Sequence, residues 1–236
     1  MKKVFFAVML LLIVTLGAAV ALAEPIGPDT INATAKGRRA DTPPQNMSAL
    51  AGNVTELSIS ATAVTDVWQG YFGNISGTIV LDDANNKSMY AWQDFSPLGE
   101  VYAVRTSNSV SWAGIACANI TNIEADETAL NIGATEKDGI NETFNATSSA
   151  DFYVGTKHIT GCSYSQFLYE NDAPASQNNF EELLLNDGTY MLYTAIINQD
   201  KTGYDNAAHD FQLMVPEDGH SGDTNPTLYY FYVELN

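Results

Sequence analysis

The sequence carries little positive charge. Its 236 residues include 10 Lys and Arg against 28 Asp and Glu, a formal net charge of −18. Lys2 and Lys3 precede the first long apolar run, so the chain beyond that run is more acidic still. A field of this sign repels phosphate backbones and anionic lipid surfaces, and we therefore expect no nucleic-acid partner. Small cations are the favoured charged ligands, unless the charge serves only solubility.

Signatures of catalysis are absent. The sequence contains no Gly-x-Ser-x-Gly, His-Glu-x-x-His, P-loop, Gly-x-Gly-x-x-Gly or Cys-x-x-Cys pattern. Its histidines are His158, His209 and His220, of which His220 adjoins Ser221 and nearby carboxylates. A nucleophilic triad requires convergence in space, which adjacency in sequence does not supply. We predict no catalytic residues and no enzymatic activity, and a secreted hydrolase is the least favoured alternative.

A single apolar run reaches the length of a membrane span, at residues 4–23. It follows Met-Lys-Lys and closes on Ala21-Leu22-Ala23 before Glu24, the pattern of a secretory signal peptide at residues 1–23. We predict cleavage after Ala23. The alternative is an uncleaved anchor, the one membrane attachment we expect, because about twenty apolar residues can cross a bilayer. In both cases the remaining chain lies outside the cell, as an extracellular or cell-surface protein.

Cysteine is scarce, with Cys117 and Cys162 alone in the chain. An even pair in an exported protein is most simply a disulfide. A metal site or a reactive thiol is the alternative, but no third Cys or His stands in ligand spacing. We predict that the two cysteines are joined.

Glycosylation sequons are more frequent than chance, which would give roughly two. Eight of the twelve asparagines between Glu24 and Asn145 belong to Asn-x-Ser/Thr patterns, and none follows Thr147. The sites are Asn32, Asn46, Asn53, Asn74, Asn86, Asn119, Asn141 and Asn145. We predict a glycoprotein whose partners bind surface built from Thr147 onward, because glycans obstruct close packing. The alternative is a polar composition that suits exposed turns and is never glycosylated.

Residues 24–51 form a proline-rich linker or leader, with four prolines and no apolar period. An alternative is that this segment is a strand donated to the open sheet edge of a neighbouring molecule, although its prolines disfavour a central strand. We assign residues 52–236 to one β-domain with an irregular insertion at about 118–150.

Apolar residues beyond the leader recur with a period of two, which predicts strands with one wet face. We therefore expect an all-β fold, an antiparallel β-sandwich of immunoglobulin-like or jelly-roll-like arrangement. Asn186-Asp187-Gly188 predicts a hairpin turn, and residues 121–131 predict one short helix before a loop at 133–149. The predicted strands are 57–63, 75–81, 89–92, 101–104, 152–154, 190–197, 211–215 and 228–235.

Two groups of residues are candidate binding sites. Six acidic residues fall within 24 positions, and carboxylates from two loops could hold a structural calcium, the one cofactor considered. These are Asp200, Asp205, Asp210, Glu217, Asp218 and Asp223. Solvated acidic loops are the alternative. Aromatic residues could stack on sugars if exposed, or else fill the core. These are Trp68, Tyr71, Phe72, Trp92 and Trp112, whereas Tyr230 and Tyr232 on the polar face of the last strand are the candidate protein interface.

Three segments carry a resemblance to known proteins: WQGYFGNISG at 68–77, HDFQL at 209–213 and YYFYVEL at 229–235. In these the chain resembles uncharacterised exported surface proteins of archaea. The resemblance implies an archaeal cell surface, where glycosylated β-rich proteins build layers, filaments and adhesive structures, but no activity. We expect a structural or assembly role, with copies of itself or other surface proteins as partners. A carbohydrate-binding or adhesion module that recognises glycans is the alternative.

Overall fold

The computed structural model describes residues 24–92, 97–106, 110–218 and 225–235. Its elements are β1 (Trp68–Gly73), β2 (Ile79–Asp82), β3 (Ser88–Trp92), β4 (Gly99–Val104), η1 (Trp112–Gly114), β5 (Ala116–Cys117), α2 (Ile120–Ala129), α3 (Ile140–Thr143), β6 (Asp151–Val154), β7 (Lys157–Thr160), β8 (Ser165–Phe167), β9 (Glu181–Asn186), β10 (Met191–Ile196), β11 (Lys201–Thr202), β12 (Ala208–His209), β13 (Phe211–Pro216) and β14 (Tyr230–Leu235). No helix within these ranges has the length and apolar character to cross a membrane. The predicted signal at 1–23 lies outside them.

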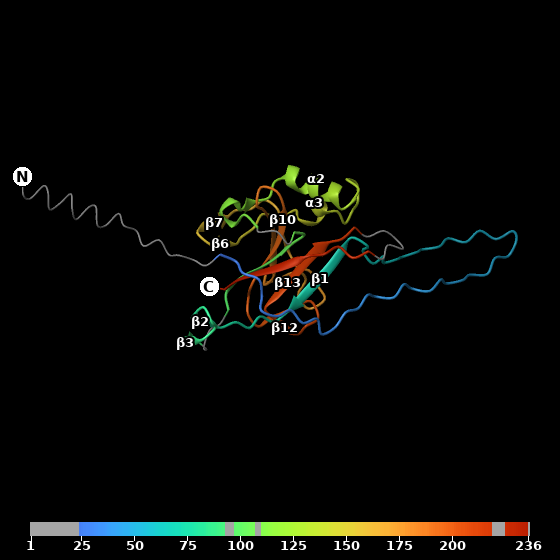
Figure 1. Ribbon diagram of the computed structural model, residues 1–236. Coiled ribbons are helices and arrows are strands. Elements are labelled where there is room, and N and C mark those ends of the chain that lie inside the picture. The colour runs from blue at the N-terminus through green and yellow to red at the C-terminus, as the bar shows by residue number, and fades with distance from the viewer. Residues whose placement is uncertain (1–23, 93–96, 107–109, 219–224, 236) are drawn as a thin grey trace, which may run out of the picture.

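A six-stranded antiparallel sheet forms the centre of the molecule (Figure 1). Its strands follow the order β14-β4-β10-β9-β5, and β8 also pairs with β9. The predicted all-β class with antiparallel pairing is confirmed. The hairpin that joins β9 to β10 also turns where the sequence predicts, with Gly188 at φ +100 and Asp187 Oδ1 accepting hydrogen bonds from the backbone N–H groups of Thr189 and Tyr190.

Both faces of this sheet are covered. On one face Ala103, Leu184 and Tyr193 belong to a core shared with α2, α3 and the ribbon of β1 and β13. On the other face Tyr102 and Leu192 pack with residues of the β6–β7 hairpin and of the segment around η1. The covering layers in the described chain are therefore two-stranded ribbons and helices, and not a second sheet of comparable size.

The insertion at 118–150 contributes to the core instead of being irregular. The predicted short helix is α2, and its N-cap Asn119 forms a capping box with Asn122. The predicted loop that follows contains α3 and the fully buried Phe144. Two polar contacts hold α2 against the sheet: Asp126 forms an ion pair with Arg105 and accepts a hydrogen bond from the Tyr193 hydroxyl at 2.7 Å. Apolar periodicity alone could not reveal this anchoring.

The strand predicted at 57–63 is wrong. These residues have no strand partner and are exposed, so the exposed part of the leader continues to Ala63, past the expected boundary at Ala51. We use "leader" below for residues 24–63. The leader begins at the edge of the sheet, where Ile26 exchanges two backbone hydrogen bonds of 2.9 and 2.8 Å with Val233 of β14.

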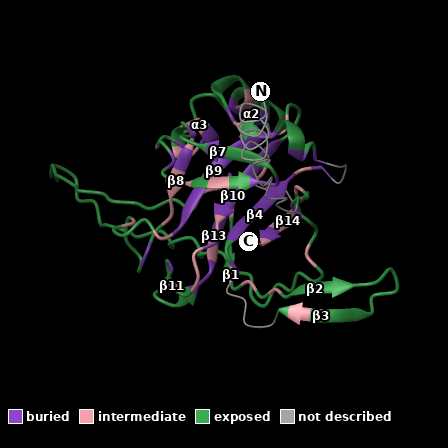
Figure 2. Cartoon of the chain, turned by 90° about the vertical axis from the view of Figure 1, so that its left-hand side faces the viewer, coloured by how far each residue is buried: buried purple, intermediate pink, exposed green. Residues whose placement is uncertain are grey.

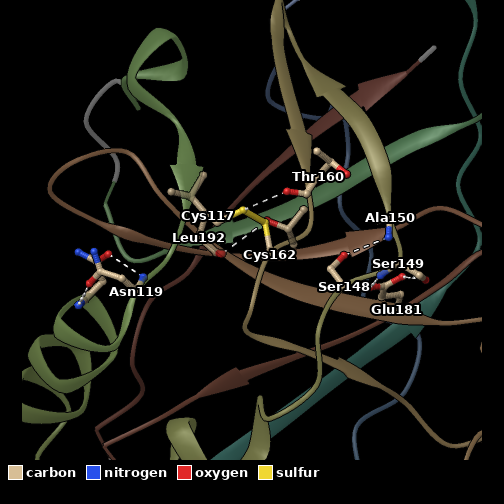
Figure 3. The surroundings of a disulfide bond; sticks show 11 residues. Cys117, Asn119, Ser148, Ser149, Ala150, Thr160, Cys162, Glu181 and Leu192 are labelled. Atoms are coloured by element: carbon tan, nitrogen blue, oxygen red, sulfur yellow. Dashed lines mark hydrogen bonds between the residues drawn. A yellow bond between two sulfur atoms is a disulfide. The ribbon is translucent and has the colours of Figure 1, made fainter.

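The predicted disulfide is confirmed, because Cys117 and Cys162 are bonded (Figure 3). The bond joins β5, at the edge of the central sheet, to the segment that follows β7. It therefore ties the covering hairpin to the sheet that it covers. Cys162 is buried among apolar residues, and Cys117 is half-buried.

We predict that replacing both cysteines by serine lowers the free energy of unfolding by about 4 kcal/mol, because the bond closes a loop with a sequence separation of 45. Urea unfolding of the two proteins measures the difference. Alkylation of the unreduced folded protein is the control and should add no mass. Two added alkyl groups would contradict the bond.

Candidate functional site

The hairpin of β2 and β3 is the most unusual surface of the described chain. It is a two-stranded sheet that projects from the body, and nearly all of its residues are exposed (Figure 2). Tyr90 and Trp92 are 59% and 49% exposed, and their rings contact each other edge to face at 4.9 Å. The other large exposed apolar side chains are Ile79, Val80, Leu81 and Met89.

Hydrogen bonds in the turn explain why this hairpin forms although its side chains are not buried. Asp83 Oδ1 accepts hydrogen bonds from the backbone N–H groups of Asn85 and Lys87 at 2.8 and 2.9 Å, and these bonds lower the pKa of the Asp83 carboxyl. Asn86 adopts a left-handed conformation with φ +58, which asparagine tolerates better than most residues. The turn fixes the register of the two strands, although their apolar side chains remain in solvent.

The apolar pairs of the hairpin lie on one face. Ile79 is paired with Trp92, and Leu81 is paired with Tyr90. Isolated two-stranded hairpins are marginal in water, and contiguous exposed apolar surface usually marks an interaction site. Sequence patterns predicted both strands and the turn but placed them in the sandwich. Periodicity reports a repeating face and cannot report whether anything covers it.

The closing strand offers less surface than we expected. The Tyr232 ring packs against Trp112 with ring centroids 5.3 Å apart, so it belongs largely to the core. Tyr230 is 39% exposed and is the accessible member of the predicted pair. The outer edge of β14 is occupied at Val233 by Ile26.

The predicted glycosylation sites are accessible. Seven of the eight asparagines are exposed, and Asn141 is half-buried. Asn86 lies in the turn of the hairpin, and Asn119 caps α2 through its side-chain oxygen. Accessibility is necessary for modification, but occupancy remains a prediction.

The predicted calcium ligands do not converge. Asp210 accepts hydrogen bonds from the backbone N–H groups of Ile75 and Asp200, and Asp205 binds His209 and a backbone N–H in the β11–β12 turn. Glu217 and Asp218 follow the far end of β13, and Asp223 lies outside the described residues. Asp205 and Asp210 thus order loops, and the described ranges contain no group of three or more His, Cys, Asp or Glu that could hold a metal ion.

The aromatic candidates are divided between core and surface. Trp112 is buried and Trp68 packs in the core, where its indole N–H donates to the Asp138 carbonyl at 2.6 Å. Trp92 is exposed on the hairpin. Tyr71 and Phe72 of β1 are also partly exposed, but their rings contact the aromatic rings of Phe231, Tyr204 and His209.

A pair of buried carboxyl groups escaped sequence analysis. Glu100 of β4 and Glu234 of β14 are directly paired in register, and each is only 2% exposed. The Tyr102 hydroxyl lies 3.3 Å from an oxygen of each, and Gly155 of the β6–β7 turn donates its N–H to Glu234 at 3.0 Å. Burial, reinforced by the nearby Glu234 charge, raises the pKa of Glu100 to about 8. The pair therefore retains a proton at neutral pH.

Comparisons with family models, with curated proteins and with solved structures find no match. The resemblance to archaeal surface proteins therefore stays a prediction. Function must be argued from the chain's own geometry.

We predict that stability falls as the pH rises from 6 to 8. The folded state keeps on Glu100 a proton that the unfolded chain, with an ordinary pKa near 4.5, has already released. Stability is thus fully present below pH 4.5 and is lost toward pH 8, by at most about 1.4 kcal/mol per pH unit. Thermal melts of Glu100→Gln should show a weaker pH dependence, whereas the exposed Glu124→Gln should behave like the native protein. An unchanged slope in Glu100→Gln would contradict the assignment.

A second prediction separates the two roles of Asn119. Asn119→Ala removes the helix cap as well as the sequon, and should destabilise the unglycosylated protein by about 1 kcal/mol. Thr121→Ala abolishes the same sequon and leaves the cap intact, so its stability should not change. Denaturant melts of both variants, produced in a host without N-glycosylation, make the comparison. Equal stabilities would show that the cap contributes nothing.

Proposed function

We propose that this protein is an exported glycoprotein of the cell surface with a structural or assembly role. The observation that carries the proposal is the projecting hairpin, because its apolar side chains lie in solvent beside a turn that is held by hydrogen bonds to Asp83. A monomer gains nothing from this exposure. A partner that covers the hairpin would remove apolar surface from water.

Two further features support export and a surface location. The disulfide fits an oxidising compartment, which export through the predicted signal would provide. Seven exposed sequons, in the leader and in the first part of the domain, leave room for a glycan coat. Among the described residues, the buried His209 and the buried carboxyl groups serve turns and the sheet, whereas His220 and Ser221, which adjoin each other in the sequence, lie outside them. A groove of about 620 Å³ lies beside residues 63–67 and 130–138 in the described part of the chain. Neither His158 nor His209 lines it.

The proposal predicts that the native protein is glycosylated and forms part of a large assembly in the envelope. Imaging native cells with a labelled antibody locates the protein, and intact mass before and after deglycosylation measures the sugar. Size analysis of gently solubilised envelopes then reports the assembly. A free, unmodified monomer in the medium would overturn the proposal.

A carbohydrate-binding role is the second candidate, and the exposed Tyr90–Trp92 pair is the observation that favours it. Aromatic rings of this exposure provide a stacking surface for a sugar. Titration with envelope polysaccharides, monitored by tryptophan fluorescence, tests this role. Trp92→Ala should abolish the response, and the buried Trp112 should not contribute.

A further inference from the structure

We propose that residues 57–63 of one copy add as a strand to the free edge of β3 in the next copy. This inference deepens the proposed function and rests on it, because it names the partner and the contact of the assembly. The donor is a segment of the leader. The acceptor is the hairpin of β2 and β3.

The donor segment has a strand pattern without a strand partner. Leu57, Ile59, Ala61 and Ala63 alternate with serine and threonine, which is the period of a strand with one apolar face. All of these residues are nevertheless exposed, with Ile59 at 85%. The sequence therefore has the pattern of a paired strand, but none of the described strands pairs with it.

The acceptor edge is open and uncharged. In the described chain β3 pairs with β2 alone, so one side of its backbone has no strand partner. The five residues of β3 carry no charge, and Tyr90, Ala91 and Trp92 pair in regular register with β2, whereas the register shifts at Met89, next to the turn. Charges are a common protection of an edge strand, and β3 has none, while its irregularity at Met89 leaves the stretch from Tyr90 to Trp92 regular. The edge of β14 is less available, because Ile26 occupies its centre.

Donor and acceptor lie on opposite sides of the molecule. The leader extends away from the body on one side and the hairpin projects on the other, and both views agree on this arrangement (Figures 1 and 2). A contact between two different surfaces is heterologous, so it leaves a donor free at one end and an acceptor free at the other. The contact therefore propagates head to tail.

Charge favours this pair of segments over other parts of the surface. Residues 64–236 carry 24 acidic and five basic side chains, whereas the leader carries four acidic and three basic ones. Residues 57–65 have no charge at all. A nearly neutral leader can approach the acidic body of a second copy without the repulsion that two bodies experience. Lys36 and Arg39 add attraction, whereas Arg38 forms an ion pair with Asp66 of its own chain.

No sequon lies within the donor segment or within β3. None falls between Asn53 and Asn74, a gap that contains the donor, and none falls between Asn86 and Asn119, a gap that contains β3. A glycan at Asn86 would lie in the turn, beyond the end of the strand. This placement differs from the expectation that partners bind only surface formed after Thr147. We place the contact on these earlier segments because their apolar side chains are exposed.

Chemical crosslinking between two variants, each with one free cysteine in addition to the native disulfide, tests the contact. Full mature chains bearing Ile59→Cys are mixed with chains bearing Met89→Cys and treated with a short bis-maleimide. The expected product is a covalent dimer in the mixture, identified by mass spectrometry of the joined peptides. Ile31→Cys is the matched control, since it lies in the same leader outside the donor and should give no product. Dimers of Met89→Cys alone, or a bond within one chain in a doubly substituted protein, would overturn strand addition.

A proline variant supplies an independent readout. Ile59→Pro removes a backbone donor from the added strand and should weaken polymerisation about tenfold, measured by sedimentation of the native-sequence protein and the variant. The melting temperature should not change, because residue 59 is exposed and unpaired in the monomer. Ile31→Pro is the control and should polymerise normally. Equal polymerisation of Ile59→Pro and the native sequence would overturn the donor assignment.

The two proposals fail separately. If imaging places the protein in a surface assembly but the mixed cysteines give no product, strand addition is wrong and the surface role stands. If the mixed cysteines crosslink but the native protein is absent from the envelope, the contact stands and the surface role is wrong.

Discussion

The pairing of β4, β9 and β10 is the interaction on which the other elements depend. β4 and β9 are buried at every position and β10 at all but its last residue, so these strands have no wet face. A sheet of this kind must be covered on both sides. The β1–β13 ribbon with α2 and α3 covers one side and the β6–β7 hairpin covers the other, where the disulfide secures it to the sheet.

Because basic residues are scarce, few buried acidic side chains of this protein can pair with a cation. From Glu24 onward the chain has eight Lys and Arg for 28 Asp and Glu, so buried carboxyl groups cannot all find a cation. Asp126 forms an ion pair with Arg105. Glu100 and Glu182 are buried without one in the described contacts, and burial raises the pKa of both. They are accommodated as protonated acids, which cost less to bury than charged ones. The fold is thereby suited to acidic more than to alkaline surroundings.

Local signals in the sequence predicted the secondary-structure elements themselves better than they predicted what those elements pack against. The turn at Asn186–Gly188 and the capped helix α2 were predictable because their residues act on neighbouring backbone groups. The disulfide followed from having two cysteines. The carboxyl pair of Glu100 and Glu234 was not predictable, because it depends on β4 and β14 becoming neighbours across a separation of more than a hundred residues. The failure at 57–63 has another cause: its period is that of a strand, but no strand of the described residues pairs with it.

Two features determine how copies of this chain could associate: its exposed β-structure and its shortage of positive charge. Ion pairs across an interface need basic residues, and the domain beyond the leader has five. Backbone hydrogen bonds between strands need no charge, and their contribution does not depend on the net charge of either copy. Strands that carry no charged side chains also keep the nearest repulsive groups away from the contact. An acidic chain that keeps 57–63 and β3 neutral therefore retains a way to associate that its overall charge would otherwise oppose.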